Sequence, residues 1–223
     1  MVETNLTGES GLNLGAYLVE AQAPRDYEPV TDRGRATKEN ILAAAEVVFG
    51  ESSYDGASIS EITRRAGVAQ GTFYQYFPDK RAAFVELVHQ LNHALRRTIA
   101  RAIAEAPDRL TAERIGFTTF FEYVRHHRSL YRIIRESEFV DIDTYRWHYT
   151  VLSEGYIQGL KQAQADGEIR DEISPDTLAW ILMGIAEAAG ARWVLWEETT
   201  PPDSVVDELM AFIHSALAPP VAL

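Results

Sequence analysis

Residues 58–80 read SISEITRRAGVAQGTFYQYFPDK, and this stretch predicts two short helices joined by a tight turn. Ser58 and Glu61 have the S-x-x-E spacing of a capping box, in which two side chains satisfy each other's free backbone N–H groups where a helix begins. Gly67 stands where the first helix needs a residue in the left-handed conformation in order to end. The first helix therefore has a start signal and a stop signal of its own.

We expect the second helix over residues 70–77, because Phe73 and Phe77 are spaced to share one buried face. Pro78 stops this helix and is well placed to begin the next one. A helix, a glycine turn and a second helix form the geometry that places the second helix in a DNA major groove. From the turn pattern alone, an ordinary helical hairpin with aromatic packing is the alternative.

The residue types in this stretch suit distinct DNA contacts. Gln70 and Thr72 offer donors and acceptors to base edges, and Gly71 removes a side chain where protein and DNA would approach closely. Tyr74 and Lys80 could donate to phosphate, which fixes register without reading sequence. The residues predicted to contact DNA are Arg35, Ser58, Ser60, Gln70, Gly71, Thr72, Tyr74, Tyr76 and Lys80.

Residues from about 35 to 84 resemble the N-terminal DNA-binding domain of the TetR family of transcriptional regulators. The most specific match is GTFYQYFPDK at residues 71–80, and weaker matches are ILAAA at 41–45, YDGASI at 54–59 and AGV at 66–68. Ala69 departs from the pattern, since the family often has a capping residue there. The resemblance implies that a basic arm, here Arg33 and Arg35, touches the minor groove or phosphate; a solvated linker is the alternative.

The charge distribution agrees with one DNA-facing segment. The net charge is −12, but residues 33–101 carry ten Lys or Arg against seven Asp or Glu. Residues 1–32 have one basic and six acidic residues, and residues 102–223 have ten and twenty. An acidic remainder keeps the rest of the molecule away from phosphates, so we expect few phosphate contacts per subunit and a strong dependence of binding on salt.

The pattern beyond this stretch predicts an all-α protein of about nine helices. Helix 1 is expected over about 37–51, a long helix from Pro78 to near Pro107, and five more over 110–126, 128–137, 143–166, 174–197 and 203–217. The expected domains are a flexible arm at 1–32, a three-helix helix-turn-helix domain at 33–80, and a helical ligand-binding and dimerisation domain at 81–223.

Aromatic residues are dense in the C-terminal part, which suggests either a pocket for an apolar or aromatic ligand or plain core packing. The resemblance implies a small-molecule pocket between the middle helices. By that analogy the wall candidates are Phe117, Phe120, Phe121, Trp147, Val151 and Trp193. Arg146 and His148 could meet a polar ligand group or could lie on the surface.

The last two helices are the best candidates for a dimer interface; the alternative is that both are internal core. Leu178, Ile181, Leu182, Ile185, Ala189 and Val194 are apolar, Gly184, Ala188 and Ala191 are small, and Val205, Val206, Leu209, Phe212, Ile213 and Leu217 form a stripe on the final helix. The resemblance implies a homodimer built from two such helices per subunit. Glu187 and Arg192 interrupt the most apolar stretch, so we expect a buried or interface helix and no membrane span.

Other classes are weaker. The chain has no Cys, which excludes disulfides and thiolate chemistry and fits a cytoplasmic location, and no exported leader is evident. No hydrolase, nucleotide-binding or zinc-protease motif occurs, so no enzyme activity, metal or cofactor is expected. His89 and His93 have a metal-ligand spacing, yet a solvated face is the favoured interpretation. The sequence therefore predicts a dimeric repressor that binds a palindromic operator and is released by a hydrophobic effector; the alternative is a helical interaction protein or an enzyme that keeps the fold.

Overall fold

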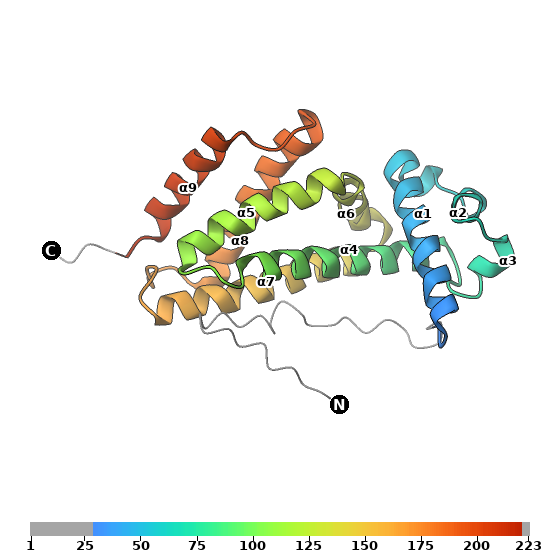
Figure 1. The fold of residues 1–223 in the computed structure, drawn as a ribbon, viewed down its shortest axis with the longest axis horizontal. Coiled ribbons are helices and arrows are strands. Elements are labelled where there is room, and N and C mark those ends of the chain that lie inside the picture. Colours follow the sequence, from blue (N-terminus) through green and yellow to red (C-terminus); the bar gives the residue numbers. More distant parts are fainter. Residues whose placement is uncertain (1–28, 220–223) are drawn as a thin grey trace. The chain divides into compact units, whose positions relative to one another are not determined.

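The computed structural model describes residues 29–219, and within that range all regular elements are helices (Figure 1). They are α1 (Asp32–Gly56), α2 (Ile59–Ala66), α3 (Gln70–Phe73), α4 (Lys80–Ile103), α5 (Arg109–His126), α6 (Ser129–Val140), α7 (Ile142–Ala165), α8 (Pro175–Gly190), the π-helical segment η3 (Ala191–Trp196) and α9 (Asp203–Leu217). The predicted all-α class with about nine helices is confirmed for the described part of the chain. Nearly all of the predicted arm, 1–32, lies outside the described residues.

The described residues form two compact units. The helix-turn-helix unit comprises 29–93 and 127–148, and the bundle unit comprises 94–126 and 149–219. Helices α4 and α7 each contribute residues to both units, so packing does not follow one cut in the sequence. The boundary predicted after residue 80 stays a prediction.

Helix α1 begins earlier and ends later than predicted. Thr31 caps it, accepting a hydrogen bond from the backbone N–H of Gly34 at 3.1 Å, and Asp32 adds a favourable negative charge to the first turn. A Cβ atom at Gly34 would lie only 2.9 Å from the Cβ of Pro29, so any larger residue at this position would clash unless the neighbouring chain moved. The chain leaves helical geometry at Ser53, where φ is 60°, and so turns towards α2.

Helix α3 is shorter than predicted, because regular helix covers only Gln70–Phe73. Ala69 supplies no side-chain cap, and the chain continues from Tyr74 as a turn in which the N–H of Phe77 still reaches the carbonyl of Phe73 at 3.0 Å. Helix α4 begins at Lys80 and not at Pro78; the Asp79 carboxylate accepts from the Ala82 N–H at 2.7 Å there.

The core of the helix-turn-helix unit is aromatic and aliphatic. Its fully buried members include Ile41, Phe49, Ile62, Phe73, Phe84 and Leu87. Helix α6 packs along α1 and is tied to it by polar contacts: Ser129 donates to Glu46 at 2.7 Å, and the N–H of Tyr54 donates to Glu136 at 2.9 Å. Helix α6 is thus part of this unit, although the sequence assigned it to the other domain.

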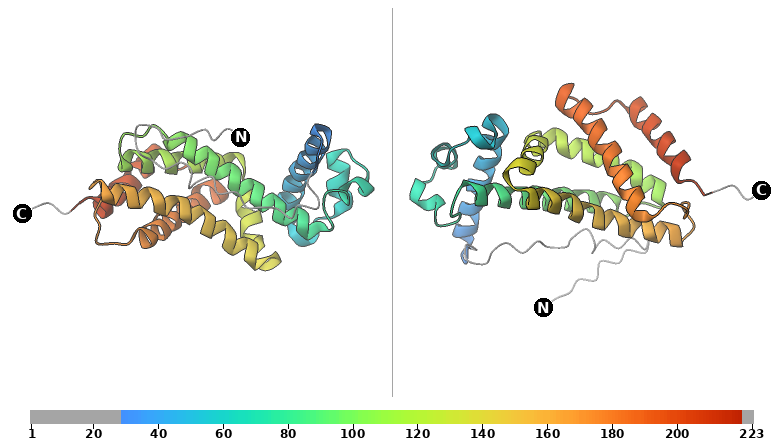
Figure 2. Two further views of the ribbon diagram at one scale, coloured as in Figure 1. Left: turned by 90° about the horizontal axis from the view of Figure 1, so that it is seen from below. Right: turned by 180° about the vertical axis from the view of Figure 1, so that it is seen from behind.

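The core of the bundle unit joins four helices, α5, α7, α8 and α9. Phe117, Leu160, Leu182 and Ile213 represent these helices among its buried residues. Both α8 and α9 pack on α5, and Figure 2 shows the three helices from two further sides. In the described part of the chain one helical stretch, Pro175–Trp196, is long and apolar enough to cross a membrane by length and composition, a property that core helices of soluble proteins share.

Candidate nucleic-acid interface

Helix α2 and its turn are held as the sequence predicts, with one difference. The Ser58 hydroxyl accepts from the Glu61 N–H at 3.1 Å, and Gly67 ends the helix with φ at 67°. The Glu61 carboxylate was expected to cap Ser58 in return. It instead accepts hydrogen bonds from Arg64 and Arg65, so only half of the capping box is confirmed.

Helix α3 presents its first turn to solvent. Gln70 and Gly71 are exposed, Tyr74 is 49% exposed, and Thr72 is half-buried. A Cβ atom added to Gly71 would find no atom within 4 Å, so nothing inside the protein requires a glycine there. Phe73 lies beneath the turn, fully buried, with its ring 5.6 Å from that of Tyr74. A rigid aromatic base therefore holds a small, polar and exposed turn.

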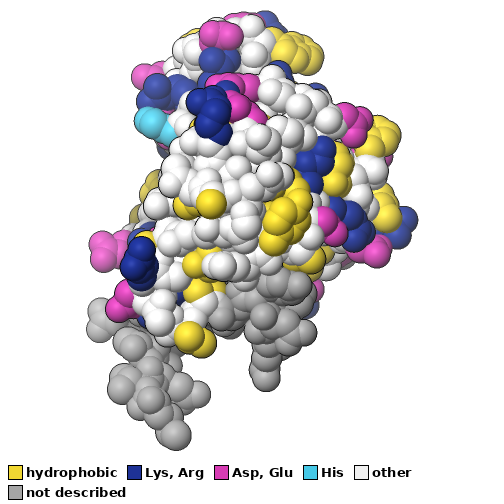
Figure 3. All heavy atoms as spheres, turned by 90° about the vertical axis from the view of Figure 1, so that its right-hand side faces the viewer, with side chains coloured by type: hydrophobic (Ala, Val, Ile, Leu, Met, Phe, Trp, Pro, Cys, Tyr) yellow, Lys and Arg dark blue, Asp and Glu magenta, His cyan; other side chains and the backbone are white. Residues whose placement is uncertain are grey.

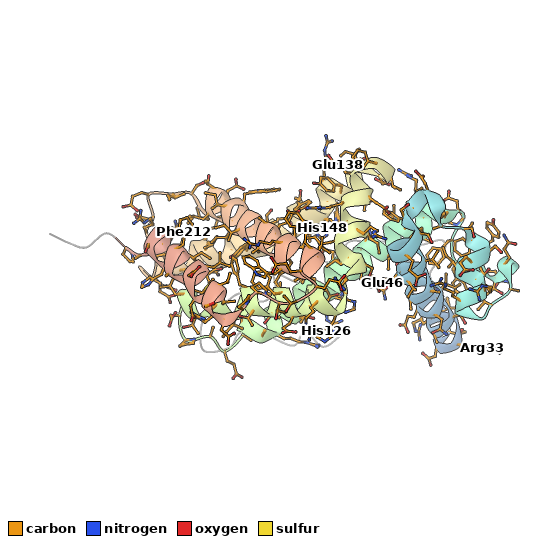
Figure 4. All side chains as sticks on the ribbon, turned by 90° about the horizontal axis from the view of Figure 1, so that it is seen from above. Arg33, Glu46, His126, Glu138, His148 and Phe212 are labelled. Atoms are coloured by element: carbon orange, nitrogen blue, oxygen red, sulfur yellow. The ribbon has the colours of Figure 1, made fainter. Side chains whose placement is uncertain are left out.

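The other predicted contact residues lie around this turn in different states. Ser58 and Ser60 are exposed on α2, and Tyr76 is half-buried after α3. Arg35 lies inside the first turn of α1, not in a free arm, and its guanidinium pairs with Asp32. Arg33 lies at the same end of α1 (Figure 4).

Lys80 has a structural role that sequence reasoning missed. Its ammonium group donates to the carbonyl oxygens of Tyr54 and Ala57, at 2.7 and 2.9 Å, and lies 4.3 Å from the centroid of the Tyr54 ring. Two of its three N–H bonds are therefore used inside the unit. The predicted phosphate contact remains a prediction, and any such contact would use the remaining N–H bond.

The charges of this unit largely neutralise one another. Residues 29–81 contain seven Lys or Arg and seven Asp or Glu. On the face that carries α2 and α3, basic and acidic side chains are interspersed (Figure 3). Hydrogen bonds from Arg64 and Arg65 lower the pKa of Glu61 to about 2, so this carboxylate is charged at neutral pH.

The predicted effector wall is only partly brought together. Phe117 and Phe121 are buried in the core of the bundle unit, and Phe120 and Trp193 pack against that core. Val151 is also buried within this unit. Trp147 belongs to the helix-turn-helix unit, where its ring lies 4.0 Å from that of His89.

The predicted polar candidates differ in environment. Arg146 is exposed, whereas His148 is buried, and its ring nitrogen Nδ1 lies 3.0 Å from the side-chain amide of Asn92. His89 was expected on a solvated face and is instead half-buried against Trp147, so that interpretation was wrong. Within the described residues, no group of three or more His, Asp or Glu side chains is placed to hold a metal ion.

Sequence reasoning also missed a buried ionic network in the bundle unit. Arg109 donates through Nε to Glu113 at 2.7 Å, and Tyr156 donates its hydroxyl proton to the same carboxylate. Arg109 and Glu113 are 4% and 3% exposed, and the guanidinium lies 5.1 Å from the centroid of the Tyr156 ring. The only signal in the sequence was the four-residue spacing of Arg109 and Glu113, which is common on solvated helices.

Among the residues predicted for a dimer interface, the structure separates three groups, of which Ile185, Val205 and Leu209 are the half-buried one. Leu178, Leu182, Ala189, Ala191, Val194, Val206, Ile213 and Leu217 are buried in the bundle unit. Ile181, Gly184 and Ala188 on α8, and Phe212 on α9, are exposed. The exposed members are joined by Trp180 and Trp196, which sequence reasoning did not assign to an interface.

Comparison with known proteins identifies the domain that contains the helix-turn-helix. The profile described as "Bacterial regulatory proteins, tetR family" matches residues 41–87, which span most of α1, all of α2 and α3, and the start of α4. The chain therefore carries, within residues 41–87, a DNA-binding domain of the TetR family of transcriptional regulators. Its helix-turn-helix unit is therefore a DNA-binding element, and the relatives found are named as regulators of transcription.

Individual TetR-family relatives match to different extents. The chain is 26% identical to the uncharacterized HTH-type transcriptional regulator YvdT of Bacillus subtilis, over 80% of this chain and 94% of YvdT. It is 32% identical to the HTH-type transcriptional regulator EthR of Mycobacterium tuberculosis, over about half of each chain (51% and 53%). The crystal structure of transcriptional regulator FadR from Bacillus subtilis in complex with stearoyl-CoA has the same fold, with a TM-score of 0.63 and 18% identity over 78% of this chain and 96% of FadR.

Proposed function

We propose that this protein is a homodimeric TetR-family repressor that binds a palindromic operator and is released by a small hydrophobic or aromatic effector. The observation that carries the proposal is the exposed turn at Gln70, Gly71 and Tyr74, held over buried Phe73. In helix-turn-helix proteins, residues at the N-terminal end of the second helix reach base edges in the major groove. Two such turns would read half-sites about one DNA turn, roughly 34–36 Å, apart.

The proposed dimer rests on exposed apolar side chains of α8, η3 and α9. Trp180 and Ile181 are 47% and 51% exposed, Phe212 is 63% exposed (Figure 4), and Trp196 is 72% exposed. Large apolar side chains exposed on the surface of one unit are candidates for an interaction site. Gly184 on α8 is exposed, with no atom within 4 Å of an added Cβ, so a second helix could approach closely there. A two-fold symmetric contact would bury these residues in both subunits at once.

The proposed effector class rests on the bundle core. Phe117, Phe120, Phe121 and Trp193 gather aromatic surface from α5 and η3, as ligand pockets in helical bundles do. The related fold of FadR was solved with stearoyl-CoA, which fits an apolar effector class for this chain as well. A fatty acyl compound or an aromatic small molecule would suit these walls.

Release by an effector requires that it prefer one state of the protein. A ligand shifts an equilibrium only by its differential affinity for the two states. Because α4 contributes residues to both units, a ligand that repacks the bundle unit would act on a helix that also belongs to the DNA-binding unit.

The test is selection of bound sequences from a random duplex pool with the purified full chain. We expect a palindromic site to be enriched by the wild type and lost with Tyr74→Ala, which removes a side chain that is 49% exposed and packs by one edge-to-face contact on Phe73. Acyl compounds and aromatic compounds are then titrated into the complex with the selected site. Absence of any enriched site at low salt would contradict the proposal, provided that the protein was purified free of bound ligand. If no hydrophobic compound released the protein from the selected site, only the effector part of the proposal would be contradicted.

A further inference from the structure

We propose that Glu61 withholds the guanidinium groups of Arg64 and Arg65 from DNA phosphates and thereby favours sequence readout over non-specific binding. This inference rests on the proposed function, because it concerns how the same interface binds DNA. It assigns a specificity-determining role to an acidic residue of the first helix of the helix-turn-helix, which does not itself read bases.

The contacts of Glu61 occupy some of the N–H groups with which the two arginines can bind phosphate. Arg64 forms a two-pronged pair with the carboxylate, through Nε at 2.8 Å and Nη2 at 2.6 Å. Arg65 donates through Nε to Glu61 at 2.7 Å and pairs through Nη2 with Glu51 at 2.7 Å. Arginine binds phosphate with the same paired N–H groups, so carboxylate and phosphate compete for them.

The position of Arg64 on α2 makes this competition relevant to DNA. Ser60, Arg64 and Gly67 are spaced to share one side of the helix, and all three are exposed. The Arg64 side chain is 70% exposed, so the carboxylate and not burial determines its position. In helix-turn-helix proteins the first helix crosses the DNA backbone, which places such residues beside phosphates.

The net charge of the helix-turn-helix segment determines how much the pairing of Glu61 with the arginines affects non-specific DNA affinity. With seven basic and seven acidic residues, residues 29–81 carry no net formal charge. Non-specific affinity arises almost wholly from phosphate neutralisation and release of counterions. A segment without net charge attracts phosphates only weakly as a whole, so hydroxyl, amide and backbone donors would carry a larger share of its DNA binding.

Exposed ion pairs are weak, so Glu61 is expected to shift the competition and not to block it fully. Glu61→Gln keeps the shape of the side chain, removes its charge and releases Arg64, whereas Arg65 keeps its pair with Glu51. Each arginine that then neutralises a phosphate should steepen the plot of log affinity against log salt by about 0.9. Affinity for any duplex rises, and the ratio of operator to non-specific affinity falls.

The experiment uses the full chain and two labelled duplexes: the site selected above and a scrambled duplex of equal composition. Fluorescence anisotropy is measured from low to moderate KCl concentrations. For Glu61→Gln we expect affinity for the scrambled duplex to rise about tenfold at low salt, with a slope steeper by about one per subunit. Glu39→Gln, the same charge change at an exposed position of α1, should leave the slope unchanged.

Two further variants identify the arginines as the cause. Adding Arg64→Ala and Arg65→Ala to Glu61→Gln should return the slope to that of the wild type. Arg64→Gln alone, which leaves Glu61 in place, should change neither the slope nor the affinity for the scrambled duplex.

Opposing results separate this inference from the proposed function. Equal effects of Glu61→Gln and Glu39→Gln, or no effect of Glu61→Gln on a wild type that binds the operator, overturn the role of Glu61. A marked loss of DNA affinity in Arg64→Gln overturns it as well. This test remains valid even if the Glu61 variants do not fold. A wild type that binds neither duplex at low salt overturns the proposed function and the inference with it.

Discussion

Lys80 binds the backbone on both sides of the corner between α1 and α2, donating to the carbonyl oxygens of Tyr54 and Ala57. The corner is held from a second side, because the N–H of Tyr54 donates to Glu136 on α6 at 2.9 Å. The preceding residue, Ser53, has a φ of 60°, a conformation that non-glycine residues seldom adopt and that surrounding contacts must maintain. A lysine that lies close to the predicted DNA face thus also fastens the first helix of the unit to α4.

Lys80→Ala should therefore lower stability as well as DNA affinity. Two partly buried carbonyl oxygens would lose their donor, which costs about 1–3 kcal/mol of unfolding free energy. Tyr74→Phe is the matched variant: it removes one exposed hydroxyl, and we expect weaker DNA binding with an unchanged unfolding midpoint. Thermal unfolding and a binding titration on both variants measure the two effects. A Lys80→Ala protein as stable as the wild type would show that these hydrogen bonds contribute nothing.

Gly71→Ala should separate folding from DNA binding. An added methyl group meets no protein atom within 4 Å, and alanine is preferred over glycine in a helix by about 1 kcal/mol. We expect unfolding at the same or a higher temperature, with operator affinity reduced at least tenfold because the methyl group stands where DNA would approach.

Gly67→Ala is the control for that substitution, because φ at Gly67 is 67° and a side chain is disfavoured there. It should cost about 1–2 kcal/mol of stability. Full operator affinity in Gly71→Ala would mean that this turn does not approach DNA closely.

The DNA-binding element was predictable because its signals are local. Gly67 ends α2 in a conformation that its residue type favours, and the four-residue spacing of Phe73 and Phe77 correctly indicated that both are buried. The length of α3 was not predictable from that spacing, since a turn after Phe73 places Phe77 on the same side as a helix would. The spacing of only two apolar residues cannot distinguish a helix from a turn.

The contacts that were missed are those between distant residues. The partners of Lys80 are backbone carbonyl groups 26 and 23 residues away, and backbone groups leave no mark in a sequence. Buried Glu113 accepts a hydrogen bond from Tyr156, 43 residues away. Similarly, the sequence showed that α8 is apolar on several sides but could not show that Leu182 faces the core while Ile181 faces solvent.

Removing one partner of the buried pair Arg109 and Glu113 should lower the free energy of unfolding strongly, whereas replacing both by apolar residues should lower it little. Glu113→Leu alone leaves a guanidinium that is 4% exposed without its carboxylate, and we expect a loss of about 3–5 kcal/mol. Arg109→Met combined with Glu113→Leu removes both charges and should recover most of that loss. Denaturant titrations give both values, and a double variant no more stable than the single one would contradict the expectation.

The environment of His89 should make stability depend on pH. Burial lowers the pKa of His89, an effect that the nearby charges of Glu86 and Asp141 partly offset. In the window between this lowered value and the unfolded value of about 6.5, the unfolded chain binds more protons than the folded one. Stability should therefore rise as pH rises through that window and fall as pH is lowered through it.

His89→Phe keeps an aromatic ring against Trp147 and removes the titration, so it should flatten this part of the stability profile. His126→Gln, at an exposed histidine of α5, serves as the control. Unfolding midpoints from pH 5 to 8 provide the measurement. An equally steep profile in His89→Phe would assign the pH dependence to another group.

Gly184→Arg should prevent dimer formation without harming the subunit. Nothing within 4 Å obstructs an added Cβ at this exposed position of α8, so a long charged side chain can extend into solvent in the monomer. In the proposed interface the same side chain would separate the two α8 helices and bury a charge. Gln158→Arg adds the same residue at an exposed position of α7, away from the proposed interface.

Sedimentation analysis should find the wild type and Gln158→Arg as dimers and Gly184→Arg as a monomer with unchanged helical content. Operator affinity should fall about 100-fold or more in Gly184→Arg, because two half-sites can no longer be bound together. Phe212→Asp, which places a charge at a position 63% exposed in the single subunit, should act in the same direction. If both variants stay dimeric, the subunits associate through another surface, and the exposed residues of α8 and α9 require a different partner.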